Sequence, residues 1–135
     1  MYDHVLVPVA YHEERDAQGA LDIAQALAAP DARITLIHVM DEIPSYAITY
    51  LPEDFRTETR KSIEADLTKR AEQFGNASIA VIEGHAGRAI TDYAARHNVD
   101  CIVIASHRPG VQDLFLGSTA ARVVRHADCS VHVLR

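Results

Sequence analysis

A short, uninterrupted apolar run, residues 101–105, constrains the fold of this chain more than any other feature. It reads C-I-V-I-A, without the polar alternation of a strand that has one face in water, so it indicates a strand buried on both faces of a parallel sheet. The run ends in a cluster of turn-forming residues, S-H-R-P-G, in which His107 and Arg108 carry or can carry a positive charge.

A helix is expected shortly after this loop. Gly117, Ser118 and Thr119 precede apolar residues at helical spacing between Ala120 and Ala127. Ser or Thr just before such a segment is typical of a helix N-cap. A helix N-terminus has free backbone N–H groups and the positive end of the helix dipole, which together favour an anion. A strand, a loop and a capped helix in this order are the geometry of a phosphate site.

The rest of the chain alternates between short apolar runs and segments of helical periodicity, which predicts one α/β domain over residues 1–135. Pro30 is expected to end the first helix. Pro8 is expected near the end of the first strand, because proline cannot donate to a ladder. The alternation of strands and helices predicts a parallel sheet with right-handed crossovers. Strands are predicted at residues 4–10, 33–40, 78–82, 101–105 and 130–134, and helices at 16–29, 53–74, 88–97 and after 117.

Residues 41–52 form a long connection that carries Tyr46, Ile48 and Tyr50. Such connections often lie over functional sites, although a loop that packs on its own domain or on a partner is the more common case. The helix after it is expected to bury one face and to leave the other, charged face in solvent. The residues expected on the buried face are Phe55, Ile63, Leu67, Ala71 and Phe74.

Charge and composition exclude several classes of protein. A net charge of −6, from 13 basic and 19 acidic residues, argues against a nucleic-acid or anionic-membrane surface. No apolar run approaches the roughly 20 residues of a transmembrane helix, and the N-terminal residues do not read as a secretory signal. Two cysteines without metal or redox spacing fit a reducing compartment. We therefore expect a cytoplasmic protein with no nucleic-acid or membrane partner.

The stretch from the fourth strand to the last helix resembles the signature of the universal stress protein family, a Gly-x-x-Gly, about nine residues, then Gly-Ser or Gly-Thr. Gly117 and Ser118 match it, Ala105 and Arg108 stand where the two earlier glycines would be, and the spacer is one residue shorter. The S-H-R-P sequence is similar to the loop of one branch of the family. The opening V-L-V-P-V and the closing H-A-D-C-S-V-H-V-L-R resemble its first and last strands, so the resemblance spans the chain.

The resemblance implies an adenine-nucleotide alpha-hydrolase-like fold with strand order 3-2-1-4-5. Ligands of open α/β sheets bind where the strand order reverses, here between the first and fourth strands. It also implies an adenine nucleotide, ATP or AMP, with the adenine at the end of the second strand and the phosphates at the loop and the Gly-Ser helix start. The candidate nucleotide-binding residues are Pro8, Val9, Ala10, Val39, Ile104, Ala105, Ser106, His107, Arg108, Gly117, Ser118 and Thr119.

Two departures from the family pattern bear on that ligand. Ala10 stands where many members have an acidic residue that reaches the nucleoside, so discrimination among bases is expected to be modest. Arg108 replaces a glycine that would let the backbone approach phosphate, but its guanidinium can hold phosphate bidentately. Gly117 is expected to be needed for the turn and for close approach of the phosphate.

Other reactive side chains have plainer interpretations. His107 could transfer protons near neutral pH, but a turn histidine or a ligand contact is the more common case. His126, Cys129 and His132 lack the paired spacing of structural zinc sites, and Cys129 is better read as a small buried hydrophobe. His38 is expected to be a satisfied core histidine. No catalytic residue or metal is predicted, except Mg²⁺ that arrives with a nucleotide.

Two functions remain open from the sequence, together with a weaker third. The first is a regulatory protein that binds an adenine nucleotide with little turnover, and the second is a nucleotide-free dimeric interaction module of the same fold. Hydrolysis is the weakest, because no Walker lysine motif, magnesium carboxylate or general base is in place. In either of the first two, Val131, His132 and Val133 of the last strand are expected to form a homodimer contact, because an exposed sheet edge is usually paired or covered.

Overall fold

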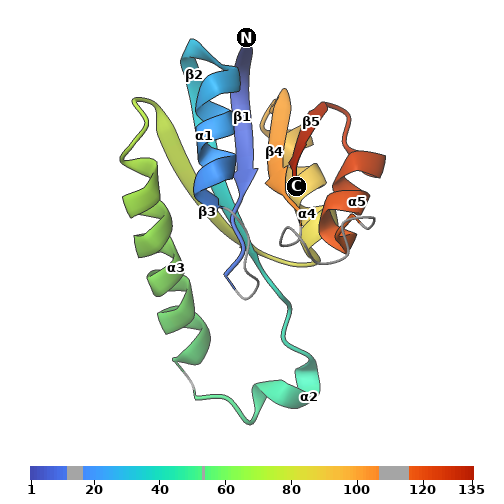
Figure 1. Ribbon diagram of the computed structural model, residues 1–135. Coiled ribbons are helices and arrows are strands. Elements are labelled where there is room, and N and C mark those ends of the chain that lie inside the picture. The colour runs from blue at the N-terminus through green and yellow to red at the C-terminus, as the bar shows by residue number, and fades with distance from the viewer. Residues whose placement is uncertain (12–16, 53, 107–115) are drawn as a thin grey trace.

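Figure 1 shows the computed structural model of the chain, which describes residues 1–11, 17–52, 54–106 and 116–135. Helices and strands alternate along it as the sequence predicts, with one additional short helix. The elements are β1 (Tyr2–Pro8), α1 (Ala17–Leu27), β2 (Ala28–Met40), α2 (Ser45–Ile48), α3 (Phe55–Ala71), β3 (Ala77–Glu83), α4 (Ala86–Arg96), β4 (Cys101–Ala105), α5 (Ser118–His126) and β5 (Ser130–Leu134).

The five strands form one parallel sheet in the order β3-β2-β1-β4-β5, which confirms the predicted fold class and strand order. The order reverses between β1 and β4, since the chain first builds outward from β1 to β3 and then crosses back. The ladder between these two strands pairs Val5 with Cys101 and Leu6 with Ile102. Their carboxyl-terminal halves lie beyond that ladder, and this is where an open α/β sheet offers a crevice for a ligand.

Helices cover both faces of the sheet, which explains the lack of polar alternation in its central strands. Helices α1 and α3 pack on one face, where Val5 and Val7 of β1 meet Leu21 and Leu67. Helices α4 and α5 pack on the other face, beside Leu6 of β1. Every residue of β4 is buried, because its alternate side chains enter the two opposite cores.

The sequence placed the end of α1 wrongly. The helix ends at Leu27, and β2 begins at once with Ala28, so Pro30 lies within the strand and does not stop the helix. The ladder is irregular at this point, because β2 advances from Ala28 to Arg33 while β1 advances only from Tyr2 to His4. A proline is tolerated in a strand at such an irregularity, where it has no ladder hydrogen bond to donate.

The long connection after β2 contains the short helix α2, which the sequence analysis did not predict. Figure 1 shows α2 and the first turns of α3 extending past the carboxyl ends of the strands. Phe55 opens α3 in this extension and is 45% exposed, so its predicted place on the buried face is wrong. Ile63, Leu67 and Phe74, which lie over the sheet, do pack against the core.

At the amino-terminal edge of the sheet, a buried polar network joins three strands to the end of α4. The His4 Nδ1–H donates to the carbonyl of His97 at 3.0 Å. The His4 Nε2 atom therefore accepts from the Thr35 hydroxyl at 2.8 Å, and Thr35 in turn accepts from Ser78 at 2.9 Å. Burial, the largest influence, lowers the pKa of His4, which favours the neutral ring that this network requires.

Candidate functional site

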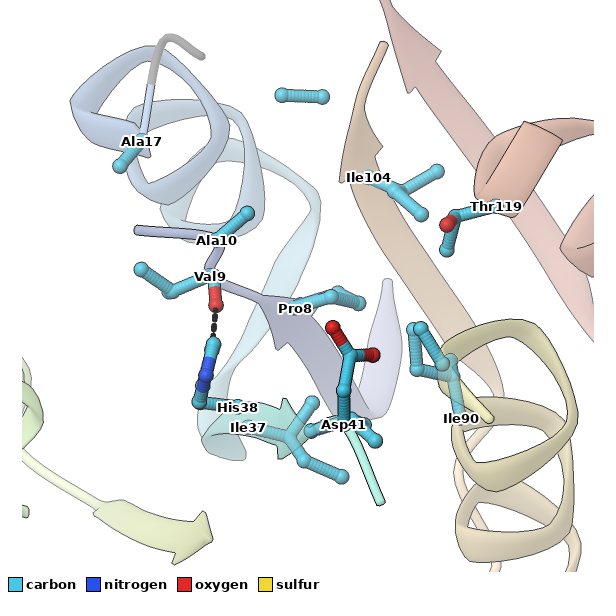
Figure 2. A pocket seen from close by; sticks show the side chains of 13 residues that line it. Pro8, Val9, Ala10, Ala17, Ile37, His38, Asp41, Ile90, Ile104 and Thr119 are labelled. Atoms are coloured by element: carbon cyan, nitrogen blue, oxygen red, sulfur yellow. Dashed lines mark hydrogen bonds between the residues drawn. The ribbon is translucent and has the colours of Figure 1, made fainter. Parts of the chain in front are cut away.

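A cavity lies at the carboxyl ends of β1, β2 and β4, where the strand order reverses (Figure 2). Its volume is about 130 Å³. Helices α1, α4 and α5 also contribute residues, so six elements meet around it. The described residues that line it are Pro8, Val9, Ala10, Ala17, Ile37, His38, Val39, Asp41, Ala86, Ile90, Ile104, Ala105 and Thr119.

The β1 wall of the cavity is held by hydrogen bonds to β2. The Val9 N–H donates to the Ile37 carbonyl at 2.8 Å, and the His38 Nδ1–H donates to the Val9 carbonyl at 2.6 Å, the bond drawn in Figure 2. Because a carbonyl can only accept, His38 carries its proton on Nδ1. His38 is 7% exposed, so the expectation of a satisfied core histidine is confirmed, although its ring also reaches the cavity.

Tyr11 ties the end of this wall to α3. Its ring meets the His38 ring edge to face, with centroids 5.0 Å apart. Its hydroxyl donates to Asp66 at 2.5 Å, and Asp66 also accepts from the Arg70 Nε–H at 2.7 Å. Burial raises the pKa of Tyr11, and the hydrogen bond to Asp66 adds to the shift. Burial would also raise the pKa of Asp66, but the bonds from Tyr11 and Arg70 outweigh it and the pKa is lowered.

The opposite wall joins the end of β4 to the start of α5. The Gly117 N–H donates to the Ser106 hydroxyl at 3.3 Å, and Ser106 is 2% exposed. Ser106 therefore holds the start of the helix against the strand. The sequence analysis expected Ser106 to contact the ligand, but Ser106 is not among the described residues that line the cavity.

The prediction that a Ser or Thr side chain caps this helix is wrong. Gly117 is the N-cap, with φ −57° and ψ 152°, and Ser118 and Thr119 are the first two helical residues. Gly117 makes no side-chain cap hydrogen bond, so the first turn keeps backbone N–H groups that an N-cap side chain would otherwise engage. Any residue can adopt the φ of Gly117, and a Cβ at this position would lie 3.9 Å from Ser106 Oγ, an ordinary van der Waals contact. The turn itself therefore does not require glycine, contrary to expectation.

Asp41 lines the cavity, although it is not among the site residues predicted from the sequence. It begins the connection after β2, which ends at Met40 as predicted, and its side chain lines the cavity. Figure 2 shows its carboxylate directed into the cavity, with Pro8 on one side and Ile90 on the other. The signal was present as period-two spacing, because Ile37, Val39 and Asp41 stand at alternate positions of an extended chain.

The structure brings most of the predicted site residues together. Those that line the cavity are Pro8, Val9, Ala10, Val39, Ile104, Ala105 and Thr119. Gly117 and Ser118 lie at the α5 N-terminus beside it. His107 and Arg108 lie outside the described residues.

Among residues 1–11, 17–52, 54–106 and 116–135, no three His, Cys, Asp or Glu side chains gather as a metal site. Cys129 is partly buried and packs against the core under α4 and α5, as expected of a small hydrophobe. None of the described helices is both long enough and apolar enough to cross a membrane.

Comparisons with known proteins agree with this architecture. The model of the universal stress protein family matches residues 1–135. Universal stress protein G of Salmonella typhimurium is 30% identical over 143 residues, covering 100% of both chains. Universal stress protein A homolog 2 of Coxiella burnetii is 29% identical, covering 99% of this chain and 95% of the relative. Among solved structures, universal stress protein UspA from Lactobacillus plantarum superposes with a TM-score of 0.77 at 28% identity, covering 99% and 98% of the two chains. The match over its whole length shows that this chain belongs to the universal stress protein family.

Proposed function

We propose that this chain is a small cytoplasmic stress-response protein that binds an adenine nucleotide, AMP or ATP, as a regulatory ligand with little turnover. One observation carries the proposal. The cavity at the reversal of the strand order has apolar walls from three strands and ends at Thr119 in the first turn of α5. An apolar pocket beside a helix N-terminus suits a molecule that joins a flat ring to a phosphate.

The apolar part of the cavity suits the base. Val39, Ile90 and Ile104 supply flat, buried hydrocarbon surface from β2, α4 and β4. A cavity of about 150 Å³ can hold a benzene molecule, and this one measures about 130 Å³. The base therefore occupies the cavity in part, and the sugar and phosphate extend along its open side.

The phosphate belongs at the start of α5. Backbone N–H groups of the first turn and the positive end of the helix dipole favour an anion there. Ser118 and Thr119 add hydroxyl groups at the same turn. From the sequence, we propose that the Arg108 guanidinium completes the phosphate contacts as a side-chain clamp.

Solved structures of the same fold support an adenine ligand. A universal stress protein family member from Arabidopsis thaliana contains AMP and aligns with a TM-score of 0.64 at 22% identity. Another universal stress protein is in complex with cAMP, with a TM-score of 0.71 at 19% identity. A third, from Archaeoglobus fulgidus, is in complex with dAMP, with a TM-score of 0.68 at 14% identity. All three ligands share an adenine base and a phosphate.

We also propose a homodimer through β5, and if no nucleotide binds, the chain is instead a nucleotide-free dimeric interaction module of the same fold. β5 is an edge strand, and along it Val131 and Val133 are half-buried while His132 is exposed. At the other edge of the sheet, the β3 carbonyl of Val81 already accepts two hydrogen bonds at 2.9 Å from the Arg60 guanidinium. Antiparallel pairing of two β5 strands would give a symmetric contact and cover an exposed edge.

Titration calorimetry with AMP, ATP and adenosine tests the nucleotide proposal. AMP and ATP are expected to bind more tightly than adenosine, and nucleotide is expected in the supernatant of the heat-denatured protein. Arg108→Ala is expected to weaken ATP about tenfold or more, because contacts to charged groups contribute roughly 1.5–3 kcal/mol, and His107→Ala is expected to have a smaller effect. A protein that carries no nucleotide and gives no heat with any of the three ligands would instead be the nucleotide-free module.

A further inference from the structure

One wall of the cavity carries a side chain that no apolar ligand would need. Ile37, Val39 and Asp41 follow one another along one face of β2 and its extension, and all three line the cavity. The two apolar members pack under α4 and α5, whereas Asp41 lies just beyond the strand end and is exposed. A negative charge therefore stands at the rim of an otherwise apolar surface.

The other polar side chains that line the cavity are those of His38 and Thr119. The His38 Nδ1–H is used by the Val9 carbonyl, and Thr119 belongs to the first turn of α5. Within the described ranges, Asp41 supplies the only carboxylate of the cavity lining. A carboxylate only accepts hydrogen bonds, so it recognises a donor group on the ligand.

Charge orients the ligand between the start of α5 and the end of β2. The phosphate is attracted to the N-terminus of α5, at Thr119, and is repelled by the carboxylate of Asp41. The nucleotide therefore lies with its phosphate toward α5 and its base toward the end of β2. In that orientation the ligand group nearest Asp41 belongs to the base, and adenine has one strong donor, its exocyclic amino group.

We propose that Asp41 is a specificity-determining residue. It accepts a hydrogen bond from the exocyclic amine at the 6-position of the base and so selects a 6-aminopurine over a 6-oxopurine. This inference rests on the proposed nucleotide binding. A 6-oxopurine presents an acceptor at the same place, and two acceptors facing each other repel. The departure of Ala10 from the family pattern led us to expect modest base discrimination, and Asp41 supplies an acceptor from the neighbouring strand.

The test compares AMP with IMP, which differ at the 6-position of the base and carry the same phosphate. Calorimetry is run on the wild-type protein, Asp41→Asn and Asp41→Ala, with Glu42→Gln as a control that removes one negative charge one residue further on. Wild type is expected to prefer AMP by about tenfold to a hundredfold, the range of one charge-assisted hydrogen bond. Asp41→Ala should lose most of that preference, and Asp41→Asn should lose or reverse it, since an amide can donate to the 6-oxo group. Glu42→Gln should keep it.

Loss of the phosphate repulsion strengthens AMP and IMP equally in the Asp41 variants, so the ratio of their affinities isolates the base. An unchanged ratio in Asp41→Asn, with thermal melting showing a folded protein, overturns the proposal. A changed preference for AMP over dAMP with an unchanged preference for AMP over IMP also overturns it, because Asp41 would then contact the sugar. Wild-type protein that binds neither AMP nor IMP refutes the proposed nucleotide binding itself, a result that differs from both of these.

Discussion

The contact between Tyr11 and Asp66 offers a direct test of how the β1 wall of the cavity is held. Tyr11→Phe removes the hydroxyl that donates to Asp66 and leaves the ring beside His38. A hydrogen bond to a charged group contributes roughly 1.5–3 kcal/mol, but the Asp66 side chain is 39% exposed. Water can replace the lost donor there and screens the charge. We therefore expect the variant to lose about 1 kcal/mol of unfolding free energy.

That loss is large enough to measure. For 135 residues, an unfolding entropy of about 2.1 cal/mol/K per residue predicts a fall in Tm of about 3–4 °C per 1 kcal/mol. Urea denaturation at pH 7 gives the free energy directly, and Tyr50→Phe is the matched control because Tyr50 is 85% exposed. A double-mutant cycle with Asp66→Asn separates the pairwise contact from the two single effects.

The same contact predicts a dependence on pH. The pKa of Asp66 is lowered in the folded protein, so the stability that the ionised carboxylate contributes is fully present above the unfolded value of about 3.9. It is lost as the pH falls through the lower folded value. The difference between wild type and Tyr11→Phe should therefore shrink in acid. A Tyr11→Phe variant as stable as Tyr50→Phe at pH 7, with no coupling to Asp66, would refute this account of the wall.

Three further predictions concern the rest of the fold. Because the pKa of His4 is lowered in the folded state, the unfolded chain takes up its proton first, and stability should fall as the pH drops from about 6.5 toward the folded value. Urea midpoints between pH 7.5 and 5 test this, and an equal slope in a folded His4→Gln variant would contradict it. Gly87→Ala should destabilise by about 1–3 kcal/mol, because its Cβ would meet Arg122 Cδ at 2.6 Å, whereas Gly75→Ala, with nothing within 4 Å, should not. Equal chemical denaturation curves for the two alanine variants would show that Arg122 moves aside freely. Val131→Asp should weaken the proposed β5 dimer without unfolding the monomer, and light scattering that finds a monomer for wild type up to high micromolar concentration would reject the dimer.

Local sequence was most informative where an element is buried on both sides. Residues 101–105 form β4 as predicted, because a run that enters two cores at once has the same apolar character at every position. The ends of helices and strands were harder to predict from the sequence, because they depend on neighbours that are distant in sequence. Pro30 reads as a helix stop, yet the irregular pairing of β2 with β1 accommodates it inside a strand. The order of the strands came from the family resemblance, because periodicity carries no information about which strands pair.

For the candidate site, too, part could be predicted from the sequence and part depended on the tertiary structure. From the sequence, the ends of β1 and β4 and the start of α5 could be located to within about two residues, and Val9, Ile104 and Thr119 line the cavity. Only the tertiary structure placed Asp41 in it and joined Tyr11 to Asp66, 55 positions along the chain. The physical reason is that strand ends are local features of hydrophobicity, whereas the partners of a side chain depend on the strand order and on how the helices pack across it.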